Sequence, residues 1–295
     1  MNMSRIQWAY LGLAAAALFW AGNAIVARAV VDLIPPITLV FWRWVIAFLV
    51  LSPFALGAVI RDRRLLLARW PKLLVLAALS VGSFNAFLYI AAQTTTAINI
   101  TLFNATVPML VVALAWLLQG QRPRLLGMVG IVLGFAGILA IVSGGEWRRV
   151  VGLSLNGGDL WMLAAVGVWG LYSVQLRQYG AGLHALSLLW ALILLGLPML
   201  LPFYVWELWS SGPLEWQPPI LWAFLFVGIF PSLLAYLFWA HGVRQAGPSR
   251  ASLFIYLIPV FTTVVAVPVL GEQLLWHHLG GGLLILAGLW LASRR

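Results

Sequence analysis

The side chains that could do chemistry in this chain are polar residues inside long apolar stretches. Asn23 lies near the middle of the first stretch. Asn85 and Tyr89 are four residues apart in the third stretch, so in a helix they share one face. A polar group in a bilayer costs free energy unless it is paired, so each is a candidate for contact with a solute. The chemistry that these residue types predict is the binding of a small polar molecule.

Arg43 is the charged member of this set. It follows Phe41 and Trp42 in the second apolar stretch, roughly 9 Å along a helix from its start. A charge at the middle of a membrane helix costs about 2.5–3.5 kcal/mol. One interpretation is a substrate-binding residue that contacts a carboxylate or another anionic group near the outer mouth. The other, which the sequence favours, is an arginine that reaches outward to Asp32 or to lipid headgroups.

Two prolines stand in the middle of apolar stretches. Pro108 removes the backbone hydrogen bond to the carbonyl of Asn104, and Pro259 does the same to the carbonyl of Ile255, next to Tyr256. We therefore expect helix breaks with a gating role at both prolines, and substrate contacts at Asn104 and Tyr256. The alternative is that the prolines only kink their helices and that the asparagines join helices to each other.

Aromatic residues accompany the polar ones. Most of the 17 tryptophans are assigned to the membrane interfaces, where Trp collects. Trp20 stands three residues before Asn23, and Trp169 stands three residues before Tyr172 at the corresponding place in the second half. The group in which we expect some substrate contacts is Trp20, Tyr89, Trp169, Tyr172 and Tyr256.

Residues for metal, nucleophilic or proton chemistry are missing from these stretches. The chain has no cysteine, and His277 and His278 are adjacent, so a helix would point them to different faces. No Ser–His pairing or Gly-Lys phosphate loop is visible, so we expect no enzymatic activity, no metal and no cofactor. None of the seven carboxylates stands at mid-span. We therefore expect a facilitator that runs down the substrate gradient, without carboxylate-driven proton antiport.

Composition predicts the elements that position these residues. Hydrophobic residues make up 63% of the chain and charged residues 8%, and the mean hydropathy is +1.02. Continuous apolar runs of about 20 residues span a hydrocarbon core of roughly 30 Å as helices. The chain is therefore predicted to be an all-α integral membrane protein in a lipid bilayer. The ten expected spans are 8–31, 37–60, 72–93, 97–118, 124–143, 159–178, 184–206, 219–240, 249–270 and 277–292.

The charges predict an orientation. Most Lys and Arg residues fall at one set of span ends, including the basic stretch Arg61 to Lys72, and six of the seven acids fall at the other. Positive residues stay inside, so both termini are expected to be cytoplasmic and the basic stretch to lie along the cytoplasmic surface. The net charge of +10 does not indicate nucleic acid, because the arginines stand at span ends instead of forming a solvated domain.

The chain also repeats itself. Leu102, Phe103 and Pro108 recur 151 residues later, and Trp20 recurs 149 residues later as Trp169. We expect two five-helix repeats, 1–146 and 147–295. Five spans is an odd number, so the second repeat must be inverted, with a pseudo-two-fold axis in the membrane plane and a site between the halves.

The ordered set of motifs resembles the drug/metabolite transporter superfamily, in particular its EamA-type ten-helix members. The residues that carry the resemblance are Trp20-Ala21-Gly22-Asn23, Phe41-Trp42-Arg43, Pro108 with Gly120-Gln121, Trp169-Gly170-Leu171-Tyr172, and Pro259 with Gly271-Glu272. The resemblance implies a helical basket with a path between inner helices and the fifth and tenth spans at the periphery.

The resemblance also implies a function. It indicates a secondary transporter of the bacterial inner membrane, working as a monomer by alternating access, that exports amino acids, aromatic ones first, or related small metabolites. The alternative is a proton-coupled exporter of drugs or organic cations, which would need a buried acid facing aromatic side chains. A channel is a further possibility, but no charged ring or carbonyl filter is visible.

Overall fold

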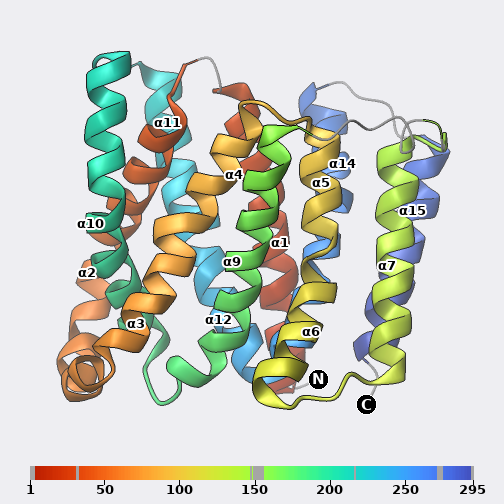
Figure 1. Cartoon of the computed structure of the whole chain (residues 1–295), viewed down its shortest axis with the longest axis horizontal. Helices are drawn as coiled ribbons and strands as arrows, with labels where there is room; N and C mark the ends of the chain where they lie inside the picture. Colours follow the sequence, from red (N-terminus) through yellow and green to blue (C-terminus); the bar gives the residue numbers. More distant parts are fainter. Residues whose placement is uncertain are drawn as a thin grey trace.

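The computed structural model is a bundle of helices packed side by side (Figure 1). It describes residues 4–30, 33–146, 148, 156–215, 217–270 and 275–293. Within these ranges, nine helical stretches are long and apolar enough to cross a membrane. A further helix, α15 (Trp276–Ser293), runs beside α7 (Leu125–Ser143) over the same height. The predicted all-α membrane fold is confirmed, while the predicted boundary between the halves, at residue 147, lies outside the described residues.

The spans follow one another in the same order in both halves. The first half contains α1 (Arg5–Ala29), α2 (Pro36–Ala68), α3–η1–α4 (Trp70–Ala77, Ala78–Phe84, Asn85–Ala92), α5–α6 (Ala97–Ala105, Val107–Gln119) and α7. The second half contains α9 (Gly157–Tyr179), α10 (Ala185–Ser211), α11–η2–α12 (Pro218–Val227, Gly228–Leu234, Ala235–Ala246), α13–η3–α14 (Pro248–Ser252, Leu253–Tyr256, Leu257–Leu270) and α15.

Four of the spans are interrupted, and the interruptions correspond between the halves. The third and eighth spans each contain a seven-residue π-helix, η1 and η2, at equivalent positions to within one residue. The fourth span breaks at Thr106, just before Pro108, and the ninth contains the 3₁₀ turn η3, just before Pro259. The helix breaks expected near Pro108 and Pro259 are therefore present, while the π-helices of the third and eighth spans were not predicted from the sequence.

Local sequence sets several helix ends. α1 begins after Ser4, whose hydroxyl accepts the backbone N–H of Gln7 while the Gln7 side chain accepts the N–H of Ser4 at 2.7 Å. This reciprocal cap satisfies two of the free donors at a helix start. α6 and α7 end at Gly120 and Gly144, which adopt φ of 65° and 63°. Glycine takes this left-handed conformation without a steric penalty.

Glycines join α7 and α15 at the edge of the bundle (Figure 1). A Cβ at Gly130 would lie 2.5 Å from the carbonyl oxygen of Gly288, and a Cβ at Gly288 equally close to that of Gly130. A Cβ at Gly137 would lie 2.5 Å from the carbonyl oxygen of Gly281, and a Cβ at Gly281 equally close to that of Gly137. The residue number rises along α7 while that of its partner falls along α15, so the two helices are antiparallel. The 151-residue repeat maps Gly130 onto Gly281 and Gly137 onto Gly288. The repeat therefore converts the contact between Gly130 and Gly288 into the contact between Gly281 and Gly137, and the reverse, as expected for an inverted repeat.

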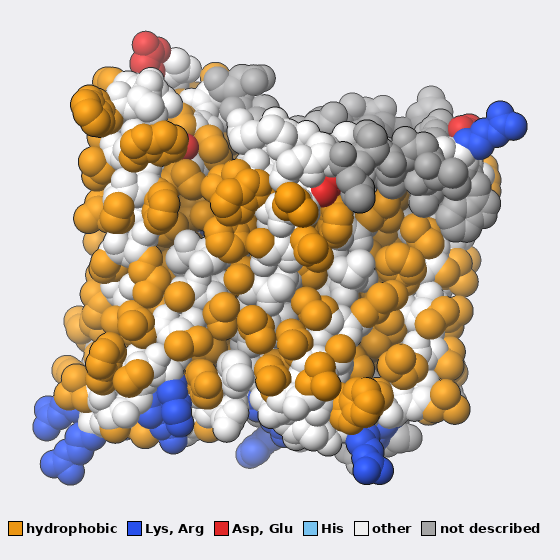
Figure 2. Space-filling model, in the orientation of Figure 1, with side chains coloured by type: hydrophobic (Ala, Val, Ile, Leu, Met, Phe, Trp, Pro, Cys, Tyr) orange, Lys and Arg blue, Asp and Glu red, His pale blue; other side chains and the backbone are white. Residues whose placement is uncertain are grey.

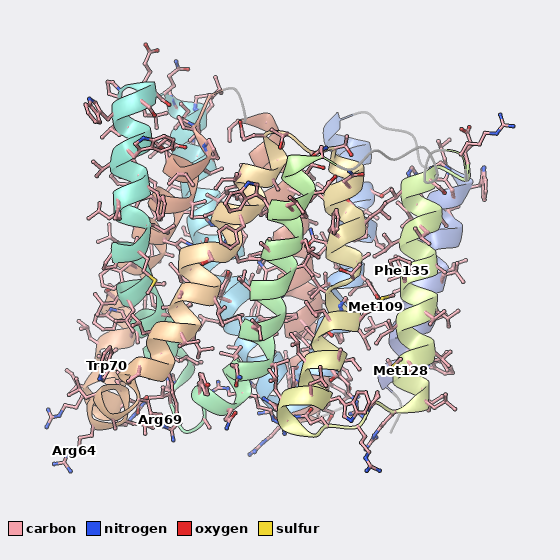
Figure 3. The ribbon with its side chains drawn as sticks, viewed as in Figure 1. Arg64, Arg69, Trp70, Met109, Met128 and Phe135 are labelled. Atoms are coloured by element: carbon pink, nitrogen blue, oxygen red, sulfur yellow. The ribbon has the colours of Figure 1, made fainter. Side chains whose placement is uncertain are left out.

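Charges separate to the two ends of the bundle. Figure 2 shows most visible Lys and Arg side chains at one end and the acidic side chains at the other. We call the end that carries both chain termini the basic face, and the opposite end the acidic face. Figure 3 places Arg64, Arg69 and Trp70 on the basic face, at the turn between α2 and α3. α2 has 33 residues, more than a membrane requires, and its last turns are seen end-on in Figure 1.

Carboxylates fasten α2 to α10 at both faces. Glu207 of α10 accepts hydrogen bonds from the backbone N–H and hydroxyl of Thr38, at 2.6 and 2.8 Å, at the start of α2. Asp62 of α2 accepts from the backbone N–H of His184 at 2.7 Å and from the hydroxyl of Ser187, at the start of α10. Thr38 and Ser187 are equivalent residues of the two halves. Each helix therefore caps the other with an anion at its positive end.

We predict that Gly137→Ala destabilises the protein and that Gly127→Ala does not. Both substitutions lie in α7 and gain the same helix propensity, but a Cβ at Gly127 has no neighbour within 4 Å in the described residues. The added methyl at Gly137 forces α7 away from α15, at a cost of about 1–3 kcal/mol. Thermal unfolding in detergent would measure the difference, and equal midpoints for the two variants would contradict the glycine contact.

Candidate functional site

Arg43 lies inside the bundle. Its side chain is 1% exposed. Nε donates to the hydroxyl of Ser232 at 2.6 Å, and Nη1 donates to Oδ1 of Asn85 at 3.1 Å and to the hydroxyl of Tyr89 at 2.9 Å. The expected outward reach of Arg43 to headgroups is therefore wrong, because its guanidinium is occupied between helices. Asp32, the other expected partner, lies outside the described residues.

The hydrogen bonds continue from Arg43 to two further helices. The hydroxyl of Tyr89 donates to Oδ1 of Asn23 in α1 at 3.3 Å, and Nδ2 of Asn85 donates to the hydroxyl of Tyr236 in α12 at 3.5 Å. The set formed by Asn23, Arg43, Asn85, Tyr89 and Ser232 is called the polar network below. Four of its five members are predicted site residues, and the structure brings all four together.

The two π-helices present side chains to Arg43. Asn85 follows directly after η1, and Ser232 lies within η2. A π turn inserts an extra residue into a helix, which re-aims the side chains that follow it, and such turns are frequent at functional sites. Ser232 also donates to the carbonyl of Val227 at 2.7 Å, which fixes the orientation of its hydroxyl toward Arg43. The duplicated π turn thus brings polar groups from both halves onto one guanidinium.

No carboxylate of the described residues forms an ion pair with Arg43. The buried acids Asp159 and Glu207 are engaged elsewhere, at helix ends: Asp159 accepts from Asn99 at 2.9 Å and Glu207 accepts from Thr38. Arg43 is held instead by neutral oxygen atoms. A buried cation without a counter-ion is costly, and an anionic ligand would compensate it.

Aromatic rings pack beside the polar network. The rings of Trp20, Trp169 and Trp239 contact one another with centroids 5.4 Å apart in each pair. Tyr236 lies 5.6 Å from Trp169 and 4.9 Å from Trp44. The aromatic cluster, as we name it, consists of Trp20, Trp44, Trp169, Tyr172, Tyr236 and Trp239. Trp20 and Trp169 are equivalent residues that touch each other, so the junction of the two halves passes between them.

Two indole N–H groups of the aromatic cluster have no acceptor in the part of the chain that the structure describes. They belong to Trp44 and Trp239, both fully buried. Trp20, by contrast, donates to the carbonyl of Pro231 at 3.1 Å. The ring of Trp44 lies 5.7 Å from the Arg43 guanidinium carbon. A buried donor without an acceptor costs about 1–3 kcal/mol, so a bound oxygen atom would stabilise it.

Other predicted site residues lie apart from this centre. The hydroxyl of Tyr256 donates to the carbonyl of Ile131 at 3.4 Å, and its ring occupies the space beside Gly134 in α7. Asn104 is half-buried on α5. Among the described hydrogen bonds, none joins Asn104 or Tyr256 to the polar network. Pro108 and Pro259 mark changes of helix geometry in the fourth and ninth spans.

Sequence reasoning missed Trp44, Ser232, Tyr236 and Trp239. Three of them were detectable, because Ser232, Tyr236 and Trp239 follow the i, i+4, i+7 spacing of one helical face. Trp44 stands next to Arg43 in the chain. Together with the predicted residues, they form a positive, donor-rich centre lined by aromatic rings. Such a centre suits a small solute that has an anionic group and an apolar or aromatic body.

Comparison with protein families gives one match, and it occurs in both halves. Residues 7–143 and 156–294 each match the EamA-like transporter family. The match therefore covers nearly the whole chain, once per half.

Individual relatives agree with this match. The chain is 30% identical over 294 residues to an uncharacterized transporter of Archaeoglobus fulgidus, covering 97% of both chains. It is 29% identical to the uncharacterized transporter YyaM of Bacillus subtilis, over 75% of this chain and 72% of that one. A solved crystal structure with 21% identity superposes with a TM-score of 0.79 and covers 97% of this chain and 96% of its own. As the sequence motifs predicted, the chain belongs to the EamA-like transporter family.

Proposed function

We propose that this EamA-like transporter exports small metabolites that carry a carboxylate, amino acids in particular and aromatic ones first. Transport follows the substrate gradient by alternating access, with the site between the two halves facing one side of the membrane at a time. The family membership supports transport of small metabolites across a membrane. The substrate class and the mechanism are the proposal.

The observation that carries this proposal is the buried charge of Arg43. Its guanidinium is 1% exposed and is held by Ser232, Asn85 and Tyr89, none of which is charged. Arginine binds carboxylates through short, charge-assisted hydrogen bonds, and these are strongest where water is excluded. A substrate carboxylate would supply the negative charge that the described residues around Arg43 do not.

The aromatic cluster supports an aromatic or apolar body for the substrate. Trp20 of the first half and Trp169 of the second meet edge to face, with an interplanar angle of 87°. A movement of one half against the other would part these rings and open space for a substrate side chain. Replacement of ring–ring contacts by ring–substrate contacts would keep the apolar surface buried in both states.

The alternative is a proton-coupled exporter of organic cations. Such a site needs a buried acid that exchanges a proton for the cation, and the buried acids Asp159 and Glu207 are engaged at helix ends. Arg43 would also repel a cation held beside the aromatic cluster. Both features favour an anionic group on the substrate.

The bacterial inner membrane is the proposed location, with the basic face and both termini in the cytoplasm, following the positive-inside rule. We propose that a single copy of the chain is the functional unit, because the site is formed between its own two halves.

We predict that Arg43→Gln lowers kcat/KM for phenylalanine by about thirtyfold or more, because loss of a buried charged pair costs about 2–5 kcal/mol. Arg43→Lys keeps the positive charge but lacks the planar set of N–H donors of a guanidinium. We therefore expect a decrease in kcat/KM that is smaller than the decrease for Arg43→Gln. The measurement is uptake of labelled Phe, Tyr, Trp and Thr into proteoliposomes at equal pH on both sides.

Arg64→Gln is the control for this experiment, since it removes one positive charge from the exposed basic face. Its flux should equal that of the unmodified protein. Flux of an organic cation driven by a pH gradient, with no amino acid flux, would reject the proposed substrate class. Unchanged phenylalanine flux in Arg43→Gln would reject the role of Arg43.

We further predict that Trp44→Phe and Trp239→Phe each weaken phenylalanine binding about tenfold, because each removes an indole N–H while keeping a ring. The loss should be much smaller for phenylalaninol, which lacks the carboxylate. Trp222→Phe is the control, since Trp222 is 70% exposed on the outside of the bundle. Equal losses for phenylalanine and phenylalaninol would mean that the indoles contribute packing alone. Ligand-induced shifts in thermal unfolding would measure both affinities.

A further inference from the structure

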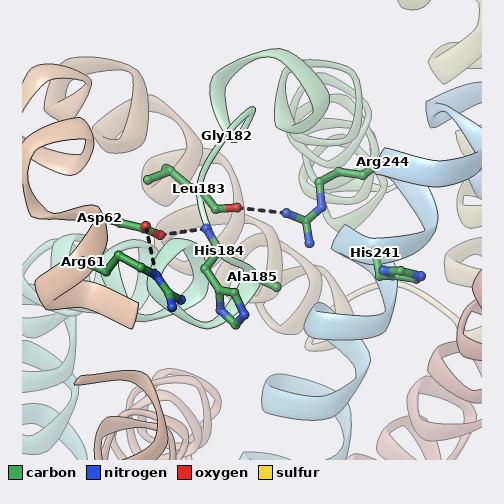
Figure 4. Close-up of a pocket in the computed structure, with 8 residues that line it drawn as sticks. All are labelled: Arg61, Asp62, Gly182, Leu183, His184, Ala185, His241 and Arg244. Carbon is green, nitrogen blue, oxygen red and sulfur yellow. Dashed lines mark hydrogen bonds and ion pairs between the residues drawn. The ribbon is translucent and has the colours of Figure 1, made fainter. Parts of the chain in front are cut away.

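An open cavity of about 770 Å³ lies on the basic face, away from Arg43 (Figure 4). It is bordered by the end of α2, the start of α10 and the last turns of α12. We propose that this cavity is a second binding site, at which an anionic group of a soluble substrate binds before it reaches Arg43. The inference rests on the proposed function for the identity of that substrate, but the site can be tested by itself.

The side chains around this cavity are mainly basic. Arg61 and Arg244 supply two positive charges, and His184 and His241 add two imidazoles. The one acid in the lining, Asp62, is occupied by the N–H of His184, the hydroxyl of Ser187 and Arg61, whose Nε lies 4.0 Å away. The cavity therefore has an excess of hydrogen-bond donors and positive charge.

Arg244 is the residue best placed to receive an anion. Its Nη1 donates to the carbonyl of Leu183 at 3.0 Å, as Figure 4 shows. A guanidinium has five N–H donors, so most remain for a ligand. Its side chain is only half-buried, which leaves it in contact with water at the cavity. The bond to Leu183 holds the guanidinium in place at the cavity wall.

The wall itself is held in one position by two contacts between the halves and one within the second half. Asp62 binds the start of α10, Arg244 binds Leu183, and Arg69 of the α2–α3 turn donates to the carbonyl of Ala181. These bonds fix the short connection between α9 and α10. The cavity is therefore formed before any ligand binds, which lowers the entropic cost of binding.

Helix α12 connects this cavity with the site around Arg43. Tyr236, Ala240 and Arg244 are spaced four residues apart and share one face of α12. Tyr236 belongs to the aromatic cluster and accepts a hydrogen bond from Asn85 of the polar network. Arg244 lies about 12 Å further along α12 toward the basic face. Tyr236 and Ala240 are buried, so passage of an anion from Arg244 toward Arg43 requires this face of α12 to open.

The absence of cysteine from the chain makes a direct test possible. Ala185→Cys would place a single thiol in the cavity lining. We predict that this thiol reacts faster with a sulfonate-bearing methanethiosulfonate than with a trimethylammonium-bearing one. Adding Arg244→Gln should reduce this preference about fivefold or more, because a nearby charge shifts the two rates in opposite directions. Adding Arg244→Lys should preserve the preference, and adding Arg124→Gln, a charge elsewhere on the basic face, should leave it unchanged.

Ligand protection tests the chemistry of the site. Benzoate should slow labelling of the Ala185→Cys thiol, benzyl alcohol should not, and the protection should disappear with Arg244→Gln. Equal labelling by the two reagents, or equal protection by benzoate and benzyl alcohol, would overturn the proposal. If anionic lipid in the nanodiscs slowed labelling of Ala185→Cys by the uncharged methyl methanethiosulfonate, and Arg244→Gln abolished that slowing, the ligand would be a lipid headgroup, which would overturn the soluble substrate.

The two proposals can fail separately. Benzoate protection without phenylalanine flux would support the cavity site and reject amino acid transport. Phenylalanine flux that depends on Arg43, without benzoate protection at Ala185→Cys, would support the proposed function and reject the second site.

Discussion

A positive charge held by neutral groups inside an apolar bundle is the constraint on which the rest of the site depends. Arg43 cannot be solvated by water or lipid, so its donors must find oxygen atoms on other helices. Those atoms come from Ser232, Asn85 and Tyr89, and each requires a particular segment to approach α2. The helices of both halves are therefore arranged around one guanidinium.

The fold is duplicated but this site is not. Equivalent positions hold Trp20 and Trp169, and the π-helices η1 and η2 correspond. Arg43, however, has Leu192 as its equivalent, and Tyr89 has Phe238. The repeat supplies a symmetric frame with an aromatic junction, and one half alone supplies the charge. The second half contributes Ser232 to the polar network, but the guanidinium and both side-chain amides of that network belong to the first half.

Much of the fold could be predicted from the sequence, because continuous apolar runs and matched motifs are direct signals of membrane helices and of duplication. The polar network was also accessible, since buried Asn, Tyr and Arg side chains are costly in a membrane and so indicate pairing. Two features were not. The π turns that aim Asn85 and Ser232 leave no clear mark in composition, and tryptophan is so frequent that Trp44 resembled an interfacial residue. Arg43 was placed wrongly because its acceptors come from helices far away in the chain.

The glycine contacts between α7 and α15 have a consequence for how the two halves can vary. Each contact is the image of the other under the repeat, so two separate copies of one five-helix unit with these glycines would meet through the same surface in opposite orientations. In such a pair of identical units, one substitution would alter both contacts at once. In the single chain each contact can change by itself, and a charge such as that of Arg43 can stand on one side of the axis only.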